Sequence, residues 1–172
     1  MGYLIGYSES RLMITYEELQ IEAKEAANKR FEYLELLRRH ANGFIEHYIQ
    51  SLGVAGNPSF SGWNGKTEKI VSVGDVDDGK FVEKYLHEFG LKENFEIKFL
   101  LKTTINTSSP QNQWVIVPIV ISSIKGKTLF VIGSGDTAKS CNIPEGNTLA
   151  VYNEAAEALK VLLIDIIKST AP

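Results

Sequence analysis

The first pattern along the chain is a helical stripe of apolar residues between positions 15 and 52. Its members recur at steps of three and four, the spacing of one face of an α-helix. They are Leu19, Ala23, Ala27, Phe31, Leu34, Leu37, Ala41, Phe44, Tyr48 and Leu52. Thr15 and Glu18 have the spacing of a capping box, in which each side chain bonds the backbone N–H of the other residue. The pattern predicts a helix that begins after Thr15 and ends at Gly53.

The length of this helix raises a question about its shape. Unbroken over 16–52, it would be about 55 Å long, whereas a compact domain of this size is roughly 40 Å across. Glycine weakens a helix interior, so we expect a kink or a break at Asn42 and Gly43. The alternative is that the helix packs on a partner, which includes a homodimer formed through this N-terminal helix.

The middle of the chain predicts a loop, a strand and a short helix. Glycine, serine and asparagine dominate 53–68, which we expect to be a long loop with Phe60 and Trp63 as its only large apolar side chains. A short strand follows over 69–73. Asp77 or Asp78 then caps a helix over about 79–89. The apolar face of this helix would consist of Phe81, Tyr85 and Phe89.

The clearest strand pattern follows. Residues 95–105 alternate between apolar and polar side chains, which predicts a strand with one buried face. Residues 114–124 are apolar on both faces and predict a central strand, in which Pro118 suggests a bulge or an unpaired stretch because proline cannot donate to a ladder. A tight turn at 125–126 leads into a strand over 128–132.

The C-terminal part predicts a polar loop over 133–147, then a short strand or first helical turn at 149–152, and a last helix capped by Asn153. The apolar stripe of that helix is Ala155, Leu159, Leu162 and Ile166. The order of elements indicates a single α+β domain over residues 1–172. We expect an antiparallel β-meander of about four to five strands packed against the long N-terminal helix, the short middle helix and the C-terminal helix.

Composition and charge exclude several classes of protein. The 172 residues have a net charge of −3 and are 44% hydrophobic, as is typical of a globular domain that needs no disulfide or metal to fold. Cys141 is the only cysteine, which excludes a disulfide scaffold and a cysteine-based zinc site. The acidic balance disfavours a nucleic-acid partner. No secretory signal or apolar span is recognisable, so we expect no membrane partner and a cytoplasmic location.

Three carboxylates gather at Asp75, Asp77 and Asp78. Carboxylates placed just after a strand can hold oxygen-preferring cations. An EF-hand is excluded, because a loop starting at Asp75 would have Gly79 at its fifth position and Leu86 at its twelfth. The remaining interpretations are a simple Asp-x-Asp magnesium site and helix capping.

A second candidate combines Asp75 or Asp77, with Asp77 preferred, with Glu96 and Lys98. It resembles the Asp…Glu-x-Lys arrangement of metal-dependent nucleases, in which two carboxylates hold magnesium and the lysine orients or activates a water molecule. The predicted strand places Glu96 and Lys98 on the same face. The intervening helix over 79–89 and the lack of a basic surface weigh against this interpretation, which remains an alternative: a magnesium-dependent hydrolase or nuclease.

The histidines and the cysteine complete the candidate chemistry. His40 and His47 lie about 10 Å apart along a helix axis, too far to hold one ion. His87 is expected on a helix surface. No flanking signature supports a dyad between Cys141 and a histidine, so an inert thiol is the favoured interpretation.

The net charge is concentrated in one segment. Residues 75–93 contain six acidic residues and three lysines, so this segment alone has a net charge of −3. Such a patch could meet a basic partner and accelerate encounter. The residues of interest are Asp75, Asp77, Asp78, Glu83 and Glu88.

In this general build, the chain resembles the immunity proteins of bacterial contact-dependent growth-inhibition and polymorphic toxin systems, which bind and block one cognate toxin domain, often a basic nuclease. The resemblance implies a non-enzymatic protein-binding antitoxin without a cofactor or a metal, whose acidic face, together with Phe60 and Trp63, docks on the toxin. A ligand-sensing or dimerisation module built on the first helix is a further alternative.

Overall fold

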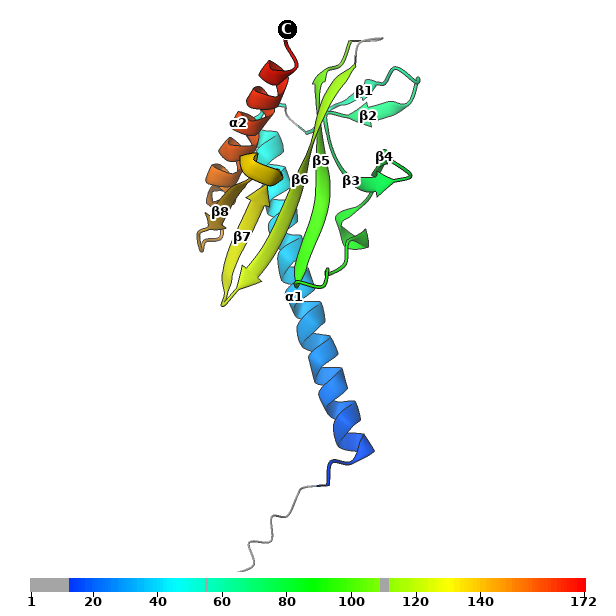
Figure 1. Cartoon of the computed structure of the whole chain (residues 1–172), viewed down its shortest axis with the longest axis vertical. Helices are drawn as coiled ribbons and strands as arrows, with labels where there is room; N and C mark the ends of the chain where they lie inside the picture. Colours follow the sequence, from blue (N-terminus) through cyan, green and yellow to red (C-terminus); the bar gives the residue numbers. More distant parts are fainter. Residues whose placement is uncertain (1–12, 55, 109–111) are drawn as a thin grey trace, which may run out of the picture. The chain divides into compact units, whose positions relative to one another are not determined.

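A computed structural model describes residues 13–54, 56–108 and 112–172 of the chain (Figure 1). The α+β class is confirmed. Two α-helices, α1 (Tyr16–Ser51) and α2 (Asn153–Ser169), accompany one six-stranded and one two-stranded antiparallel sheet. The chain divides into two units, Met1–Tyr33 and Leu34–Pro172, and α1 contributes residues to both.

In the first unit, α1 begins as the sequence predicts. The Thr15 backbone N–H donates to Glu18 Oε2 at 2.7 Å, and the Glu18 backbone N–H donates to Thr15 Oγ1 at 3.2 Å. These two bonds form the capping box and satisfy donors that the first helical turn would leave unpaired. All side chains of 16–32 are exposed.

In the second unit, α1 is continuous through Asn42 and Gly43, where we expected a kink or a break. Glycine has a packing role at this position. A Cβ atom on Gly43 would lie 2.6 Å from Tyr152 Cε2, which is too close for any side chain. The missing side chain therefore lets the Tyr152 ring pack directly on the helix backbone.

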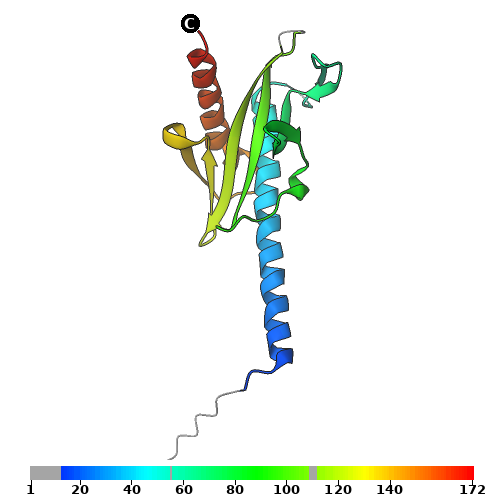
Figure 2. The same cartoon turned by 45° about the vertical axis from the view of Figure 1, so that its right-hand side comes forward.

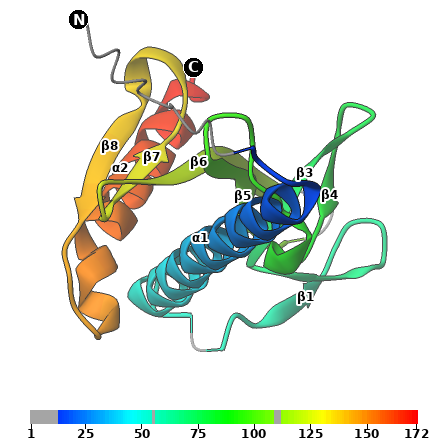
Figure 3. The same cartoon turned by 90° about the horizontal axis from the view of Figure 1, so that it is seen from below.

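The six-stranded sheet has the order β4-β3-β5-β6-β7-β8, and all neighbouring strands are antiparallel (Figure 3). Its strands are β3 (Val71–Asp77), β4 (Lys80–Glu83), β5 (Glu96–Asn106), β6 (Gln113–Ile124), β7 (Lys127–Ile132) and β8 (Lys139–Ile143). The sheet alone exceeds the four to five strands that we predicted. Lys125 and Gly126 form the expected tight turn, with φ angles of 50° and 77°.

One face of this sheet forms the core. Residues 34–51 of α1 and helix α2 both lie behind the sheet in the view of Figure 2. The Phe44 ring packs edge-on against Phe130 with a centroid distance of 5.1 Å, and the Tyr48 hydroxyl bonds Thr103 Oγ1 at 2.8 Å. The buried apolar residues of the three central strands are Ile97, Phe99 and Leu101 of β5, Val117, Ile119 and Ile121 of β6, and Phe130 and Ile132 of β7.

Pro118 causes no bulge in the ladder between β5 and β6. It pairs in register with Leu100, and the irregularity of this ladder lies at 104–106 instead. The Pro118 carbonyl accepts a bond from the Gly133 backbone N–H at 2.9 Å, and pairing with β7 starts at the next residue, Ile119. Pro118, which has no N–H to donate, thus lies level with the end of β7. The part of β6 before it has no partner strand on the β7 side.

The predicted middle helix is absent. Asp78 and Gly79 have φ angles of 50° and 73°, which are the left-handed values that a two-residue hairpin turn requires. The chain therefore returns as strand β4 and then forms the 3-10 helix η1 (Leu86–Glu88). An Asp-Gly pair after a strand favours a hairpin, and this preference overrides the helical spacing of the aromatic residues.

Two predicted loops also contain strands. Segment 53–68 includes β1 (Ser59–Ser61) and contributes to β2 (Thr67–Lys69), which pair as a separate hairpin. Segment 133–147 includes the 3-10 helix η2 (Gly135–Thr137) and β8. Residues 149–152 form the 3-10 helix η3 (Leu149–Tyr152), which leads into α2 as one of our two alternatives predicted. None of the helices in the described part of the chain has the length and apolar character of a membrane span.

Candidate protein-binding surface

The three aspartates of the acidic cluster lie on the hairpin of β3 and β4. Asp75 is opposite Val82 and Asp77 is opposite Lys80, while Asp78 occupies the turn. Strand β4 is the edge strand of the sheet, because it pairs only with β3. Edge strands present unpaired backbone groups along one side and are common docking elements.

The register assigns the carboxylates to two faces. Side chains alternate along a strand, so Asp75 and Asp77 share the face of Val71, which is buried towards the helices. Glu83 is opposite Gly74 and belongs to the other face. The structure therefore brings the three aspartates together and places Glu83 behind them, on the same hairpin.

These carboxylates are not neutralised within the described part of the chain. Among the described residues, Asp75, Asp77, Asp78 and Glu83 form no ion pair, and the one hydrogen bond of this group is from the Val76 backbone N–H to Asp75 Oδ1 at 2.8 Å. The same hairpin exposes apolar side chains, because Val76 is 57% and Val82 is 38% exposed. Uncompensated charge next to exposed apolar surface is typical of a surface that binds another protein.

An ordered aromatic pair follows β4. The rings of Tyr85 and His87 stack with a centroid distance of 5.5 Å and an interplanar angle of 8°, although Tyr85 is 75% exposed. The Glu88 carboxylate accepts a bond from the Tyr85 backbone N–H at 2.6 Å. Glu88, predicted as a contact residue, therefore orders the backbone that carries the tyrosine.

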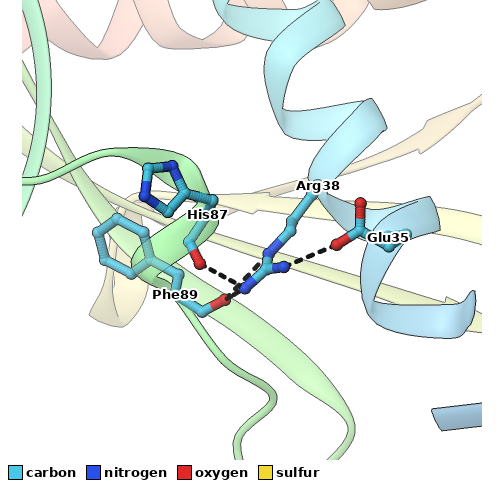
Figure 4. Close-up of polar contacts among 4 residues, drawn as sticks. All are labelled: Glu35, Arg38, His87 and Phe89. Carbon is cyan, nitrogen blue, oxygen red and sulfur yellow. Dashed lines mark hydrogen bonds and ion pairs between the residues drawn. The ribbon is translucent and has the colours of Figure 1, made fainter. Parts of the chain in front are cut away.

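The Arg38 side chain of α1 points towards this turn and binds its backbone, as Figure 4 shows. Its guanidinium donates to the backbone carbonyl of His87 at 2.6 Å from Nη2, and to that of Phe89 at 2.8 Å from Nη2 and 3.2 Å from Nε. Glu35 accepts the remaining bond, from Nη1 at 2.7 Å. A guanidinium bound to two carbonyls and a carboxylate fixes the turn firmly. We call residues 75–88, anchored in this way, the edge surface.

Phe60 and Trp63 lie in the separate hairpin of β1 and β2. Trp63 is 65% exposed, and Phe60 is half-buried opposite Glu68. In the described part of the chain, neither forms a polar or ring contact with the carboxylates of the edge surface. Glu68 instead forms an ion pair with Lys102 of β5 at 3.9 Å, which ties this hairpin to the sheet face that the helices leave uncovered.

The residues of the hydrolase alternative do not converge. Glu96 and Lys98 share a face of β5 with Lys102, opposite Ser122 and Val120 of β6. Asp77 belongs to the helix-covered face. Within the ranges that the structure describes, no group of three His, Cys, Asp or Glu side chains is placed to hold a metal ion.

Cys141 and His40 have structural surroundings. Cys141 is buried, and burial raises the pKa of its thiol, with Glu154 as a smaller cause, which disfavours the reactive thiolate. His40 Nδ1 bonds the Tyr152 hydroxyl at 2.9 Å and Nε2 bonds Thr128 Oγ1 at 3.1 Å, so both ring nitrogens are used. Burial, with a smaller contribution from Arg39, lowers the pKa of His40. This histidine is not available as a base for the cysteine.

A groove of about 530 Å³ lies between the unpaired part of β6 and the end of α2. Its lining contains no charged or titratable side chain and consists of Ile105, Asn112, Gln113, Trp114, Val115, Ile116, Ile166, Ile167 and Thr170. It can accept an apolar group but offers no acid, base or nucleophile. The groove does not include any residue of the edge surface.

The fold and the edge surface define an α+β protein with an anchored acidic hairpin at one sheet edge. Searches against protein-family models, curated proteins and solved structures find no match for the chain. Sequence analysis missed Tyr85 and His87 as members of the surface and Arg38 as its anchor. The one available signal was Asp78-Gly79, which marks the hairpin that brings Tyr85 and His87 to the edge.

Proposed function

We propose that this chain is a protein-binding module whose edge surface docks on a basic protein, and that it acts as an immunity protein against a toxin domain. The observation that carries the proposal is the exposed Tyr85–His87 stack, which lies on the same segment, 75–88, as carboxylates that form no ion pair in the described part of the chain. The proposal places the protein in the cytoplasm, where it blocks its cognate toxin.

Preorganisation favours a role for Tyr85 in affinity. Aromatic residues dominate the energetics of many interfaces, and a side chain that is already ordered loses little entropy on binding. Arg38 and Glu88 order the backbone on both sides of the tyrosine through the bonds described above. An exposed tyrosine held in this way is suited to enter a pocket of a partner.

Charge favours a basic partner. Segment 75–93 has a net charge of −3, and its aspartates form no ion pair with any other described residue, so they remain available to a cationic surface. Complementary charges increase the association rate and select against acidic partners. A toxin nuclease offers such a surface, because it must bind phosphates.

The experiment uses the product of the gene that adjoins this one. That product is expressed with and without the chain, cell growth is measured, and affinity is determined by calorimetry on the purified proteins. We expect a toxic product whose effect the chain suppresses. Tyr85→Ala, and separately the triple variant Asp75→Lys, Asp77→Lys, Asp78→Lys, should each weaken binding about a hundredfold, the range of interface hot spots.

The matched control is the triple variant Asp136→Lys, Glu145→Lys, Asp165→Lys, which makes the same change of net charge at exposed positions away from the edge surface. It should bind with nearly unchanged affinity. Equal losses in both triple variants would contradict a localised docking surface. If no adjoining product were toxic, the immunity function would be wrong.

A further inference from the structure

The part of α1 that belongs to the first unit exposes large apolar side chains to solvent. Tyr16 is 75% and Leu19 is 56% exposed. Helical segments of this length are marginal in water unless an apolar face is covered by packing. A covering surface for residues 16–33 is therefore expected, and the charges on the segment indicate which one.

Part of this segment follows a heptad. Tyr16, Leu19, Ala23 and Ala26 are separated by steps of three, four and three, which is the spacing of the seam of a coiled coil, and the next two seam positions are Arg30 and Tyr33. Ala23 and Ala26 lie at its centre, where small side chains allow two helices to approach closely. This spacing permits a helix partner but does not by itself identify it.

The charge is segregated along the segment. Residues 16–25 contain four glutamates and one lysine, a net charge of −3, whereas residues 26–33 contain Lys29, Arg30 and Glu32, a net charge of +1. Two parallel copies would place the acidic parts side by side. Two antiparallel copies place each acidic part against a basic part, so the segment is complementary to itself in that orientation alone.

We propose that two copies of this chain pair through residues 16–33 as an antiparallel coiled coil, with Ala23 of one copy opposite Ala26 of the other. The contact is isologous, so every interaction occurs twice. Glu22 and Lys29 both occupy the heptad position just before a seam residue. In an antiparallel pair these positions face each other, and Glu22 therefore meets Lys29 of the second copy.

This geometry predicts a charge-swap experiment on the full chain, read out as the dimer dissociation constant by analytical ultracentrifugation. The wild-type protein should dimerise in a concentration-dependent manner. Glu22→Lys and Lys29→Glu each create two like-charge contacts and should each weaken the dimer about tenfold, since surface pairs contribute modestly. The double variant E22K/K29E restores both ion pairs and should return the dissociation constant to within about threefold of wild type.

Glu32→Lys is the matched control, because it makes the same charge change on the outward side of the heptad. It should alter dimerisation by less than about threefold. Circular dichroism of each variant verifies that the helix is retained. A wild-type protein that is monomeric at all concentrations would overturn the proposal. So would a dimer insensitive to the single reversals, as a parallel pair would be, or a double variant that fails to recover. A monomeric variant that still binds the partner protein would show that dimerisation and the proposed binding function are independent of each other.

Discussion

The two halves of α1 have the same periodicity and opposite surroundings. In residues 34–51, Leu37, Ala41, Phe44 and Tyr48 are fully buried against the sheet. In residues 16–33, the corresponding positions are exposed. The difference lies in the side chains, because the buried half fills space with leucine and aromatic rings, whereas the exposed half has alanines at the centre of its stripe. Periodicity thus predicts a helix and its apolar face, and the volume of the side chains indicates what that face packs against.

The halves also differ in polar contacts. The buried half makes specific hydrogen bonds through Arg38, His40 and Tyr48 to distant parts of the chain. The exposed half carries charges arranged in an acidic and a basic block. One half therefore packs within the chain, whereas the other has the segregated charges on which the proposed helix pairing rests.

The largest expected difference between the halves comes from truncating one phenylalanine in each. Phe44→Ala removes a fully buried ring that packs on Phe130 and should lower the free energy of unfolding by about 3–5 kcal/mol. Phe31→Ala should change it by less than about 0.5 kcal/mol, because that ring is exposed. Urea unfolding followed by circular dichroism measures both. Similar losses in the two variants would contradict the division of α1 into a buried and an exposed half.

A smaller effect is expected at Gly43. Helix propensity alone predicts that Gly43→Ala stabilises α1 by about 1 kcal/mol. The Cβ would lie 2.6 Å from Tyr152 Cε2, so we expect the opposite, a loss of about 1–3 kcal/mol from overpacking. Asn28→Ala, in the exposed half, is the control and should be neutral or slightly stabilising in the same thermal unfolding assay. A stabilised Gly43→Ala variant would show that the Tyr152 ring can move away at little cost.

The smallest expected effect is a pH dependence of stability that the buried half contributes through His40. Burial lowers the pKa of His40 below its ordinary value of 6.5, so the unfolded chain takes up this proton more readily than the folded protein. The stability is complete above pH 6.5 and should fall as the pH decreases below it. His40→Gln should flatten the unfolding midpoint between pH 7 and pH 5 relative to wild type. Identical profiles for the two proteins would exclude this contribution.

Local patterns in the sequence predicted most of the fold. The capping box at Thr15 and the alternation along β5 depend on neighbouring residues only, and both are confirmed. The short strand β8 was missed because it buries only two side chains, Cys141 and Ile143, and exists through its pairing with β7. The helix expected over 79–89 was wrong because Asp78 is as well suited to a hairpin turn as to a helix cap.

The candidate surface was predictable only in part. Its carboxylates could be placed in one segment, but the register of β3 and β4 decides that Asp75 and Glu83 have opposite faces. The bonds from Arg38 to the carbonyl groups of His87 and Phe89 join residues about 50 positions apart, a tertiary contact without any sequence signature. The sequence shows where the charged residues lie along the chain. The directions in which they point and the contacts that anchor them depend on the assembled sheet.

The contacts of α1 with Phe130 and Tyr152 have a consequence for the order of events during synthesis. The helix leaves the ribosome before the sheet does. Its packing partners come later, because Phe130, which packs on Phe44, and Tyr152, whose ring packs on the backbone at Gly43, belong to the last third of the chain. Until those residues emerge, the apolar side of the helix lacks part of its intramolecular cover, at Phe44 and Gly43, and is open there to chaperones and to other nascent chains. Completion of the fold must therefore wait for β7 and η3, however early the helix itself forms.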